Sequence, residues 1–500
     1  MTPIDYIVLV GYFVVTVILG TFAFSRQTGL KEYFIGSRSI PWLASMASLT
    51  VTAISAVTFI GIPALSFKKD LTDFQIYFGF PIAALVAAWF IVPFYYRMDI
   101  LTAYEYLEQR FDYRIRALGS VLFQTKELFV LGIVIVAPAK ILAEISGMSF
   151  EAAAILVVVA TAVYTIAGGI KAVIWTDVLQ LFVLLGGPVV AMYLLVERMD
   201  GGLSQIVDIA RTHQKLNLVD TSFSLETEVT VWAAFSGLML YWFSEWVISQ
   251  SSVQRYLTGK SMQESRRALI YTGLVATLIW GFFFLIGIAL YAFHVAYPER
   301  LPAGDDADRV FVRFITNEMP DGVRGLVLSG VFAAAMSTLS SRMNALASLT
   351  VVDLLQRAFP EKVRNRELLW ARWMTFGWSV IGVLAAMVLV RWGGVIKVGM
   401  RLGNLLVGPL VGIFLLGMLT RRANATGVLA GGLIGVGAVG LTALLTYVSW
   451  GWYTLIGSVT SMTAGYLLSR CWEFLAPVKS SSECEEDRIT CMGEASDRAD

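Results

Sequence analysis

Residues 333–344, AAAMSTLSSRMN, place four hydroxyls, an arginine and an asparagine inside a stretch of chain that is otherwise apolar. Positions three and four apart share one face of a helix, so these polar groups are expected to form a stripe. The stripe consists of Ala334, Ser337, Ser341, Asn344 and Ser348, with Thr338 and Ser340 beside it. Small hydroxyl residues also let membrane helices pack closely, which is the alternative for any one serine. A hard monovalent cation such as Na⁺ prefers oxygen ligands, and the clustering of hydroxyls predicts a cation site.

A second oxygen-rich stretch lies near residues 41–66 and includes PWLASMASLTVTAISAVTFIGIPAL. Its hydroxyl residues are Ser45, Ser48, Thr50, Thr52, Ser55 and Thr58, and Gly61 and Pro63 follow them. Proline and hydroxyls inside an apolar span mark places where a helix can break, and broken backbone is tolerated in a membrane only where it lines a cavity. Secondary transporters place such segments near the bilayer midplane, where the freed carbonyls bind cations. The two stretches together predict an ion site.

The elements that would position these oxygens are membrane spans. Of the 500 residues, 57% are hydrophobic and 15% charged, and the mean hydropathy is +0.69, which predicts an integral membrane protein. A run of roughly 20 apolar residues crosses the hydrocarbon as a helix, and such runs predict about thirteen spans. They lie near 5–24, 41–66, 74–96, 117–144, 150–167, 173–196, 228–250, 268–294, 322–352, 371–391, 394–418, 425–447 and 451–470. The first begins MTPIDYIVLVGYF, without a basic leader, and is predicted to be a permanent helix.

The distribution of basic residues predicts the orientation, because Lys and Arg accumulate in cytoplasmic loops. Loops predicted to close on one side contain Arg97, Arg110, Arg114, Arg116, Arg255, Lys260, Arg266, Arg267, Arg357, Lys362, Arg364, Arg366, Arg372, Arg421 and Arg422. With thirteen spans, this places the N-terminus outside and the C-terminus in the cytoplasm of a cell whose plasma membrane holds the protein.

Several function classes have little support in the residues. The cysteines Cys471, Cys484 and Cys491 lie at the predicted inner end, and they indicate neither a disulfide framework nor a metal site. The two histidines, His213 and His294, lie in or beside external loops. A formal net charge of +1 gives no indication of nucleic acid binding, and no obligate protein partner is evident. No catalytic dyad or nucleotide motif occurs, so we expect no enzyme activity.

Six stretches together carry a family resemblance. They are YFIGSRSIPWLASMASLTVTAISAVTFIGIPA, TAYEYLEQRFDYRIRALG, YTIAGGIKAVIWTDVLQ, SQSSVQRYLTGKS, FAAAMSTLSSRMNALASLTVVDL and GPLVGIFLLGMLTRRANATG. In this order the chain, from about residue 31 to 430, resembles the sodium:solute symporter family. The resemblance implies an all-α membrane protein of the LeuT-like fold, in which two inverted five-helix repeats each begin with a broken helix.

The resemblance also implies a division of the chain. A leading helix and cytoplasmic loop would occupy 1–40, and the two repeats 41–196 and 228–418 would flank an external loop at 197–227. Two trailing helices at 419–472 and a cytoplasmic tail at 473–500 would follow.

By the same resemblance, two groups of residues would bind Na⁺. The main site would use the carbonyls of Val51, Ile54 and Ala334 with the hydroxyls of Ser337 and Thr338. A second site, present in some members, would use Asp177 in VIWTDVLQ with Ser340 and Ser341. The alternative for Asp177 is a helix cap or a polar anchor at the inner membrane surface.

The resemblance points to a solute site between the broken helices and their neighbours. Its residues would be Ser55, Thr58, Asp73, Tyr77, Lys126, Glu127, Trp242, Glu245, Trp246 and Ser249. Glu245 departs from the family, because several sugar-transporting members have a tyrosine there, and the alternative for it is pairing with Lys126 or Arg342. Arg342 is a second departure, and we expect it to pair with an acid or to extend toward the cytoplasm rather than to bind solute.

The solute is the least determined part. The stretches GGIKAVIWTDVLQ, TAYEYLEQRFDYRIRALG and QSSVQRYLTGKS resemble most the branch that carries monocarboxylates and carboxylate-bearing vitamins. The basic residue that holds the carboxylate in sialic acid carriers aligns near Val130, with Lys126 one turn away, which disfavours sialic acid. We therefore expect Na⁺-coupled uptake of an organic anion by alternating access, with a sugar, polyol or sialic acid second. A sodium-dependent sensor or a channel on the same core is the other class.

Overall fold

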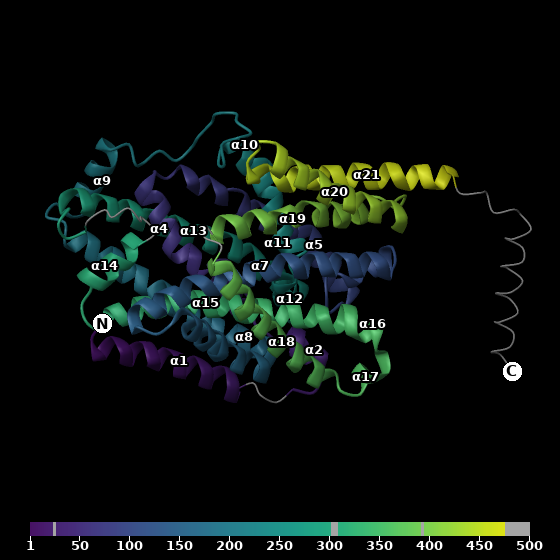
Figure 1. Ribbon diagram of the computed structural model, residues 1–500, viewed down its shortest axis with the longest axis horizontal. Coiled ribbons are helices and arrows are strands. Elements are labelled where there is room, and N and C mark those ends of the chain that lie inside the picture. The colour runs from purple at the N-terminus through teal and green to yellow at the C-terminus, as the bar shows by residue number, and fades with distance from the viewer. Residues whose placement is uncertain (24–26, 302–308, 392–394, 476–500) are drawn as a thin grey trace, which may run out of the picture.

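The computed structural model describes residues 1–23, 27–301, 309–391 and 395–475, and these residues form helices and connecting loops with no strand among them (Figure 1). The first helices are α1 (Pro3–Ala23), α2 (Leu30–Ile35), α3 (Trp42–Ala53), α4 (Ala56–Lys68), α5 (Gly79–Met98), α6 (Glu105–Arg110), α7 (Tyr113–Ser146), α8 (Phe150–Glu197) and α9 (Gly202–Thr212). The all-α class is confirmed. The predicted tail beyond Leu475 lies outside the described residues.

The remaining helices complete the bundle. They are α10 (Val231–Ala233), α11 (Met239–Val247), α12 (Gln250–Tyr256), α13 (Met262–Ala296), α14 (Val310–Glu318), α15 (Val323–Ser348), α16 (Gln356–Ala358), α17 (Pro360–Arg364), α18 (Glu367–Arg391), α19 (Val395–Leu419), α20 (Ala425–Leu445) and α21 (Tyr453–Leu475). Figure 1 shows the long helices lying roughly along one direction, as expected of a membrane bundle. Two π-helical segments, Ala234–Leu238 and Leu349–Leu355, continue α10 and α15.

Eight helices of the described chain are long and apolar enough to cross a membrane, and ten are counted if each of two bent pairs forms one span. The spans predicted separately at 150–167 and 173–196 both lie within α8, and the non-helical backbone of Gly169 (φ 55°, ψ −147°) forms a kink between them. The prediction of thirteen spans stays a prediction.

The two bent pairs are the first helices of the two predicted repeats. Helices α3 and α4 meet at an angle of 58°, and the segment Val231–Val247 meets α12 at 57°. The sequence suggested that Gly61 and Pro63 would favour a break, but both residues lie inside α4. The break itself falls at Ile54 and Ser55, where the backbone is extended.

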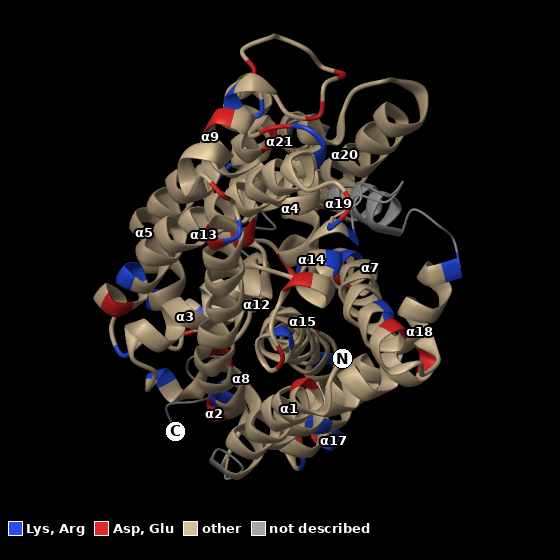
Figure 2. Cartoon of the chain, turned by 90° about the vertical axis from the view of Figure 1, so that its left-hand side faces the viewer, with Lys and Arg blue, Asp and Glu red and all other residues tan. Residues whose placement is uncertain are grey.

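Helix α15 lies at the centre of the bundle. In Figure 2 it is enclosed by α1, α8, α12, α7 and α18, and nearly all of its residues are buried. Its close approach to α8 requires glycine at position 187, because a Cβ there would lie 2.8 Å from Val327 Cα. Its N-terminal end is fixed by the buried carboxylate of Asp5, which accepts the amides of Gly322 and Gly325 at 2.8 and 3.1 Å. The hydroxyl stripe is therefore held on the most enclosed helix.

Candidate functional site

The break between α3 and α4 leaves backbone oxygens without helical partners. The Ser55 hydroxyl accepts the Thr58 amide at 3.3 Å and so caps α4, which is what serine does well at this position. Because α3 ends at Ala53, its last carbonyls have no amides of a following helical turn to accept. The Val51 carbonyl accepts the Ile54 amide at 3.2 Å. No donor among the described residues reaches the Ile54 carbonyl.

The hydroxyls of α15 face this break. Thr338 Oγ1 donates to the Ala334 carbonyl at 2.9 Å and lies 3.4 Å from the Thr52 carbonyl. The Ser337 hydroxyl lies 3.2 Å from Thr52 Oγ1. Ala334, Ser337 and Thr338 are all buried. Thr52, which was counted among the hydroxyls of its span but not assigned to a site, is the residue that joins the two helices.

This arrangement suits a monovalent cation. It offers buried carbonyl and hydroxyl oxygens of neutral groups, the donor class that hard cations prefer. No group of three or more His, Cys, Asp or Glu side chains that could hold a metal ion occurs among the described residues. The five residues predicted for the main Na⁺ site all lie at this junction of α3, α4 and α15.

Asp177 and Ser341 of the predicted second Na⁺ site meet around a guanidinium. The fully buried Arg255 of α12 lies 3.5 Å from the Asp177 carboxylate and donates to the hydroxyls of Ser48, at 2.6 Å, and of Ser341. Ser48 also donates to Asp177. The Ser340 hydroxyl instead donates to the Ser337 carbonyl at 3.0 Å.

Two sequence expectations about the position of arginines are wrong, and one of the alternatives given for Asp177 is removed. Arg255 was assigned to a cytoplasmic loop, but it is buried in a helix because Asp177 balances its charge. Arg116 was also assigned to a loop, but it is buried in α7 and paired with Asp353 at 2.6 Å. Asp177 caps no helix, since α8 runs through it.

Four charged side chains from three helices form a second buried cluster, called here the charge quartet: Lys126, Glu127, Glu245 and Arg342. Lys126 and Glu127 belong to α7, Glu245 to α11 and Arg342 to α15. Lys126 Nζ lies 3.0 Å from Glu127 Oε1 and 3.4 Å from Glu245 Oε1. Arg342 donates to Glu127 Oε2. Arg342 thus pairs with an acid, as expected, and Glu245 pairs with Lys126.

Aromatic rings gather beside the quartet. Tyr77 stacks on Trp280 with ring centroids 4.1 Å apart, and Trp242 lies 5.7 Å from Tyr77 and 5.4 Å from Trp280. Trp246, which follows Glu245 in the chain, lies 5.1 Å from Phe80. The predicted solute residues Tyr77, Trp242 and Trp246 therefore belong to one aromatic cluster, in which Trp280 and Phe80 were not foreseen.

The other predicted solute residues are less close to each other. The hydroxyls of Ser55, the cap of α4, and of Thr58, in its first turn, lie 2.9 Å apart. The buried Ser249 hydroxyl lies 3.1 Å from that of Ser251, and among the described residues no hydrogen bond or ion pair joins it to the quartet. Asp73 is paired with Lys69 at 3.0 Å.

Asp73 lines an open hollow of about 470 Å³ at the end of the bundle that carries α9. Its walls are Lys69, Asp70, Thr72, Asp73, Asp220, Thr227, Glu228 and Val229. Nearby, Lys215 donates to the carbonyls of Phe67 and Lys69 at 2.9 and 2.6 Å, and so holds the end of α4. Burial lowers the pKa of Lys215, opposed by the charge of Asp70.

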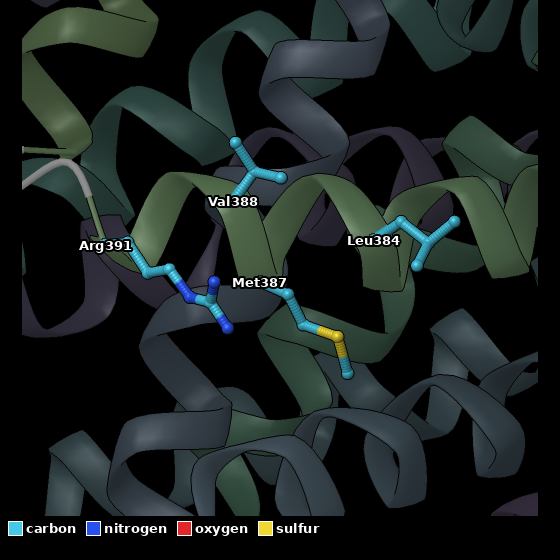
Figure 3. Close-up of a pocket in the computed structure, with 4 residues that line it drawn as sticks. All are labelled: Leu384, Met387, Val388 and Arg391. Atoms are coloured by element: carbon cyan, nitrogen blue, oxygen red, sulfur yellow. The ribbon is translucent and has the colours of Figure 1, made fainter.

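A second hollow, of about 340 Å³, is lined by Leu384, Met387, Val388 and Arg391, all on α18 (Figure 3). Leu384 and Val388 are more than half exposed on the outside of the bundle. This apolar surface offers little to a polar solute.

Comparisons with known proteins identify the family to which this chain is similar. The family model of the sodium:solute symporter family matches residues 33–435. The sodium/sialic acid symporter SiaT of Proteus mirabilis is 32% identical over 489 residues, covering 96% of this chain and 97% of that protein. Sodium-coupled monocarboxylate transporter 1 of Homo sapiens is 31% identical over 439 residues, covering 85% and 71%.

Solved structures of sodium-coupled and related transporters have a similar fold. A Na⁺-coupled sialic acid symporter in a substrate-bound outward-open state, with a novel Na⁺ site, superposes with a TM-score of 0.86 at 31% identity, covering 94% of this chain and 98% of that one. A nucleobase-cation-symport-1 family transporter superposes at 0.56 with 15% identity over 91% and 98%, which shows the fold alone.

Fold and site thus define a Na⁺-coupled secondary transporter of the LeuT-like fold, and not an enzyme. The chain belongs to the sodium:solute symporter family. The expected order of solutes does not hold against these comparisons, because sialic acid symporters match more of the chain than the monocarboxylate transporter does.

Proposed function

We propose that this chain couples the inward movement of Na⁺ to the uptake of a carboxylated sugar of the sialic acid type. The observation that carries the proposal is Lys126, a buried ammonium whose partner Glu245 adjoins both a helix break and the aromatic cluster. A buried cation next to a solute path is by default functional, and it suits a carboxylate. The aromatic rings suit the apolar faces of a sugar. The likeness to two sialic acid symporters supports the same solute.

For the coupling ion, we propose the junction of α3, α4 and α15 as the main site, with Val51, Ile54, Ala334, Ser337 and Thr338 as its ligands. The unpartnered Ile54 carbonyl and the neighbouring hydroxyls support this assignment. Na⁺ bound there would join the two halves of the broken helix to α15. A coupling free energy of about 1 to 3 kcal/mol between ion and solute would be ordinary.

A second Na⁺ at Asp177, Ser340 and Ser341 is part of the proposal. It requires Arg255 to move away from Asp177, because the guanidinium lies where a cation would bind. Binding of the second ion would then depend on the conformation of α12.

The proposed transport cycle follows from these contacts. Na⁺ binding completes the outward-open solute site, solute binding closes the outer side, and one bundle rocks inward to release both. We place the protein in the plasma membrane with the N-terminus outside and the C-terminus in the cytoplasm, and we keep the two repeats at 41–196 and 228–418. Without the buried Arg116 and Arg255, the remaining loop cations still favour this orientation.

The second candidate solute is a simple monocarboxylate. It is favoured by the likeness to the human monocarboxylate transporter and by the presence of a single lysine at the quartet with a displaceable partner. A carboxylate alone would satisfy Lys126, whereas the aromatic cluster would then have no counterpart in the solute.

The test is thermal stabilisation of the purified protein by sialic acid, lactate and glucose, each in Na⁺ and in K⁺. Stabilisation by sialic acid in Na⁺ but not in K⁺ supports the proposal. Stabilisation by lactate and not by sialic acid supports the second candidate. Stabilisation by glucose alone would contradict a carboxylate solute altogether.

A further inference from the structure

The charge quartet has no net charge, but its members are held unequally. Glu127 is almost fully buried and contacts two cations, Lys126 and Arg342. Glu245 has one ion-pair partner among the described residues, Lys126 at 3.4 Å, and its side chain is 19% exposed. Glu245 is therefore the member that can leave most easily.

The contacts of the quartet can be divided into two acid–base pairs, Arg342 with Glu127 and Lys126 with Glu245. Arg342 donates to Glu127 and is sufficient to neutralise it. Lys126, with a side chain that is 5% exposed, is then the excess cation, and Glu245 is the acid that balances it. Leaving an excess charge buried is costly, so the two cations of the quartet need a second acid beside Glu127 in every state of the carrier.

Glu245 is placed where a solute could displace it. It lies three residues before Ile248, at the end of α11, where the chain breaks before α12. Its neighbours Trp242 and Trp246 belong to the aromatic cluster. A carboxylate arriving at Lys126 would meet Glu245, and like charges at one ammonium favour the departure of the exposed one.

From this asymmetry we infer that Glu245 is an internal substitute for the carboxylate of the solute. In the empty carrier it neutralises Lys126, and in the loaded carrier the carboxylate of the solute takes its position. This inference rests on the proposed function, since it requires a carboxylate-bearing solute. It gives Glu245 a role in the return of the empty carrier, during which Lys126 and Arg342 would otherwise share the single carboxylate of Glu127.

The alternative role for Glu245 predicts the opposite result. If its carboxylate bound a hydroxyl or an ammonium group of the solute directly, removing its charge would weaken solute binding. The sign of the change in affinity therefore separates the two roles.

The experiment uses the full chain in proteoliposomes, with Glu245→Gln as the test variant and Glu361→Gln, an exposed acid of α17, as the matched control. Sialic acid and lactate are the probes. For the probe that the wild type transports, Glu245→Gln should bind about fivefold more tightly, the factor expected when a partly exposed ion pair no longer competes. Exchange of labelled for unlabelled solute should continue, while net uptake into empty vesicles should fall by about tenfold or more, because the empty carrier then returns with two buried cations and only one acid, Glu127.

Glu245→Asp provides a second variant in case the glutamine does not fold. Aspartate keeps the charge but is one methylene shorter, so it reaches Lys126 less well and should give an intermediate gain in affinity. If either folded variant binds the probe more weakly than the wild type, or if net uptake and exchange fall together, the inference is overturned while the proposed function stands. If the wild type binds neither probe in Na⁺, the proposed function fails and the inference fails with it.

Discussion

The two helix breaks of this carrier are alike in angle and unlike in their backbone oxygens. At the break between α11 and α12, three buried tyrosines donate to successive carbonyls: Tyr256 to Trp246 at 3.0 Å, Tyr95 to Val247 at 2.8 Å and Tyr104 to Ile248 at 3.0 Å. At the break between α3 and α4, no tyrosine among the described residues makes such a contact.

The difference indicates two uses of the same irregularity. An unsatisfied carbonyl in a membrane interior costs several kcal/mol, so freed backbone oxygens require a partner. The chain supplies that partner permanently at the second break, which is then a fixed part of the scaffold. In the proposed sodium site the transported ion is the missing partner at the first break, and this break would then depend on sodium for its stability.

The largest expected effect concerns the link between the two broken helices, which Arg255 provides through Ser48 on α3. Asp177→Asn would leave the buried guanidinium without its counter-ion and should lower the free energy of unfolding by about 3 to 5 kcal/mol. Chemical denaturation in detergent, compared with the double variant Asp177→Asn with Arg255→Met, measures it. The double variant should recover much of the loss, and a double variant as unstable as the single one would contradict the pairing.

The next effect should be confined to the first break. Thr338→Ala removes a hydroxyl proposed to bind the ion, and a lost bond to a charged group corresponds to a roughly tenfold or greater rise in the Na⁺ concentration for half-maximal uptake. Insertion into the membrane should be unchanged, because the side chain is small. Sodium titration of solute uptake tests this. Thr338→Ser, which keeps the oxygen, is the control, and an unaltered Na⁺ requirement in Thr338→Ala would remove the residue from the site.

The third effect should be confined to the second break. Tyr104→Phe deletes the donor to the Ile248 carbonyl and should reduce the free energy of unfolding by about 1 to 2 kcal/mol. The half-saturating Na⁺ concentration should stay the same, which is the reverse of the Thr338→Ala result. Tyr447→Phe, at an 89% exposed tyrosine, is the matched control. A change in Na⁺ affinity would show that the two breaks are not distinct in function.

The smallest effect concerns the loop that leads into the first broken helix. The hydrogen bonds from Lys171 and from Thr28 hold the pKa of Glu32, on α2, below its ordinary value of 4.5. A lowered pKa contributes stability above that value, and the contribution is lost as pH falls through the folded pKa. The free energy of unfolding of the wild type should exceed that of Glu32→Gln by about 0.5 kcal/mol at pH 7, and this difference should shrink below about pH 4.5. Thermal unfolding of both proteins at pH 7 and at a pH below about 4.5 measures the difference. A difference that does not change with pH would exclude the ion pair as its cause.

Local sequence patterns were informative for some of the residues that the structure brings together and uninformative for others. Hydroxyl spacing is a local property, so Ser337 and Thr338 could be placed on one helix face before the structure was known. Gly61 and Pro63 did not locate the break, because both lie inside α4. It falls at Ile54 and Ser55, beside the carbonyls of Val51 and Ile54 that the family resemblance had implied.

Long-range pairing explains the other misses. Arg255 lies in a short polar helix without an apolar run, and its partners Ser48, Asp177 and Ser341 are distant in the chain. The hydrogen bond from Tyr104 to the Ile248 carbonyl could not be predicted from the local sequence either, because the residues around a tyrosine do not indicate which distant carbonyl its hydroxyl contacts.

The zero net charge of the quartet determines how membrane voltage acts on the cycle. If the empty site carries no net charge, its return is not driven by the potential. A solute with one negative charge that travels with one Na⁺ would also cross as a neutral load. With a second Na⁺ the load would carry one positive charge, and about 2.3 kcal/mol of drive would be gained for every 100 mV of potential. An electric current during uptake would thus indicate two sodium ions per solute, and uptake without a current would indicate one.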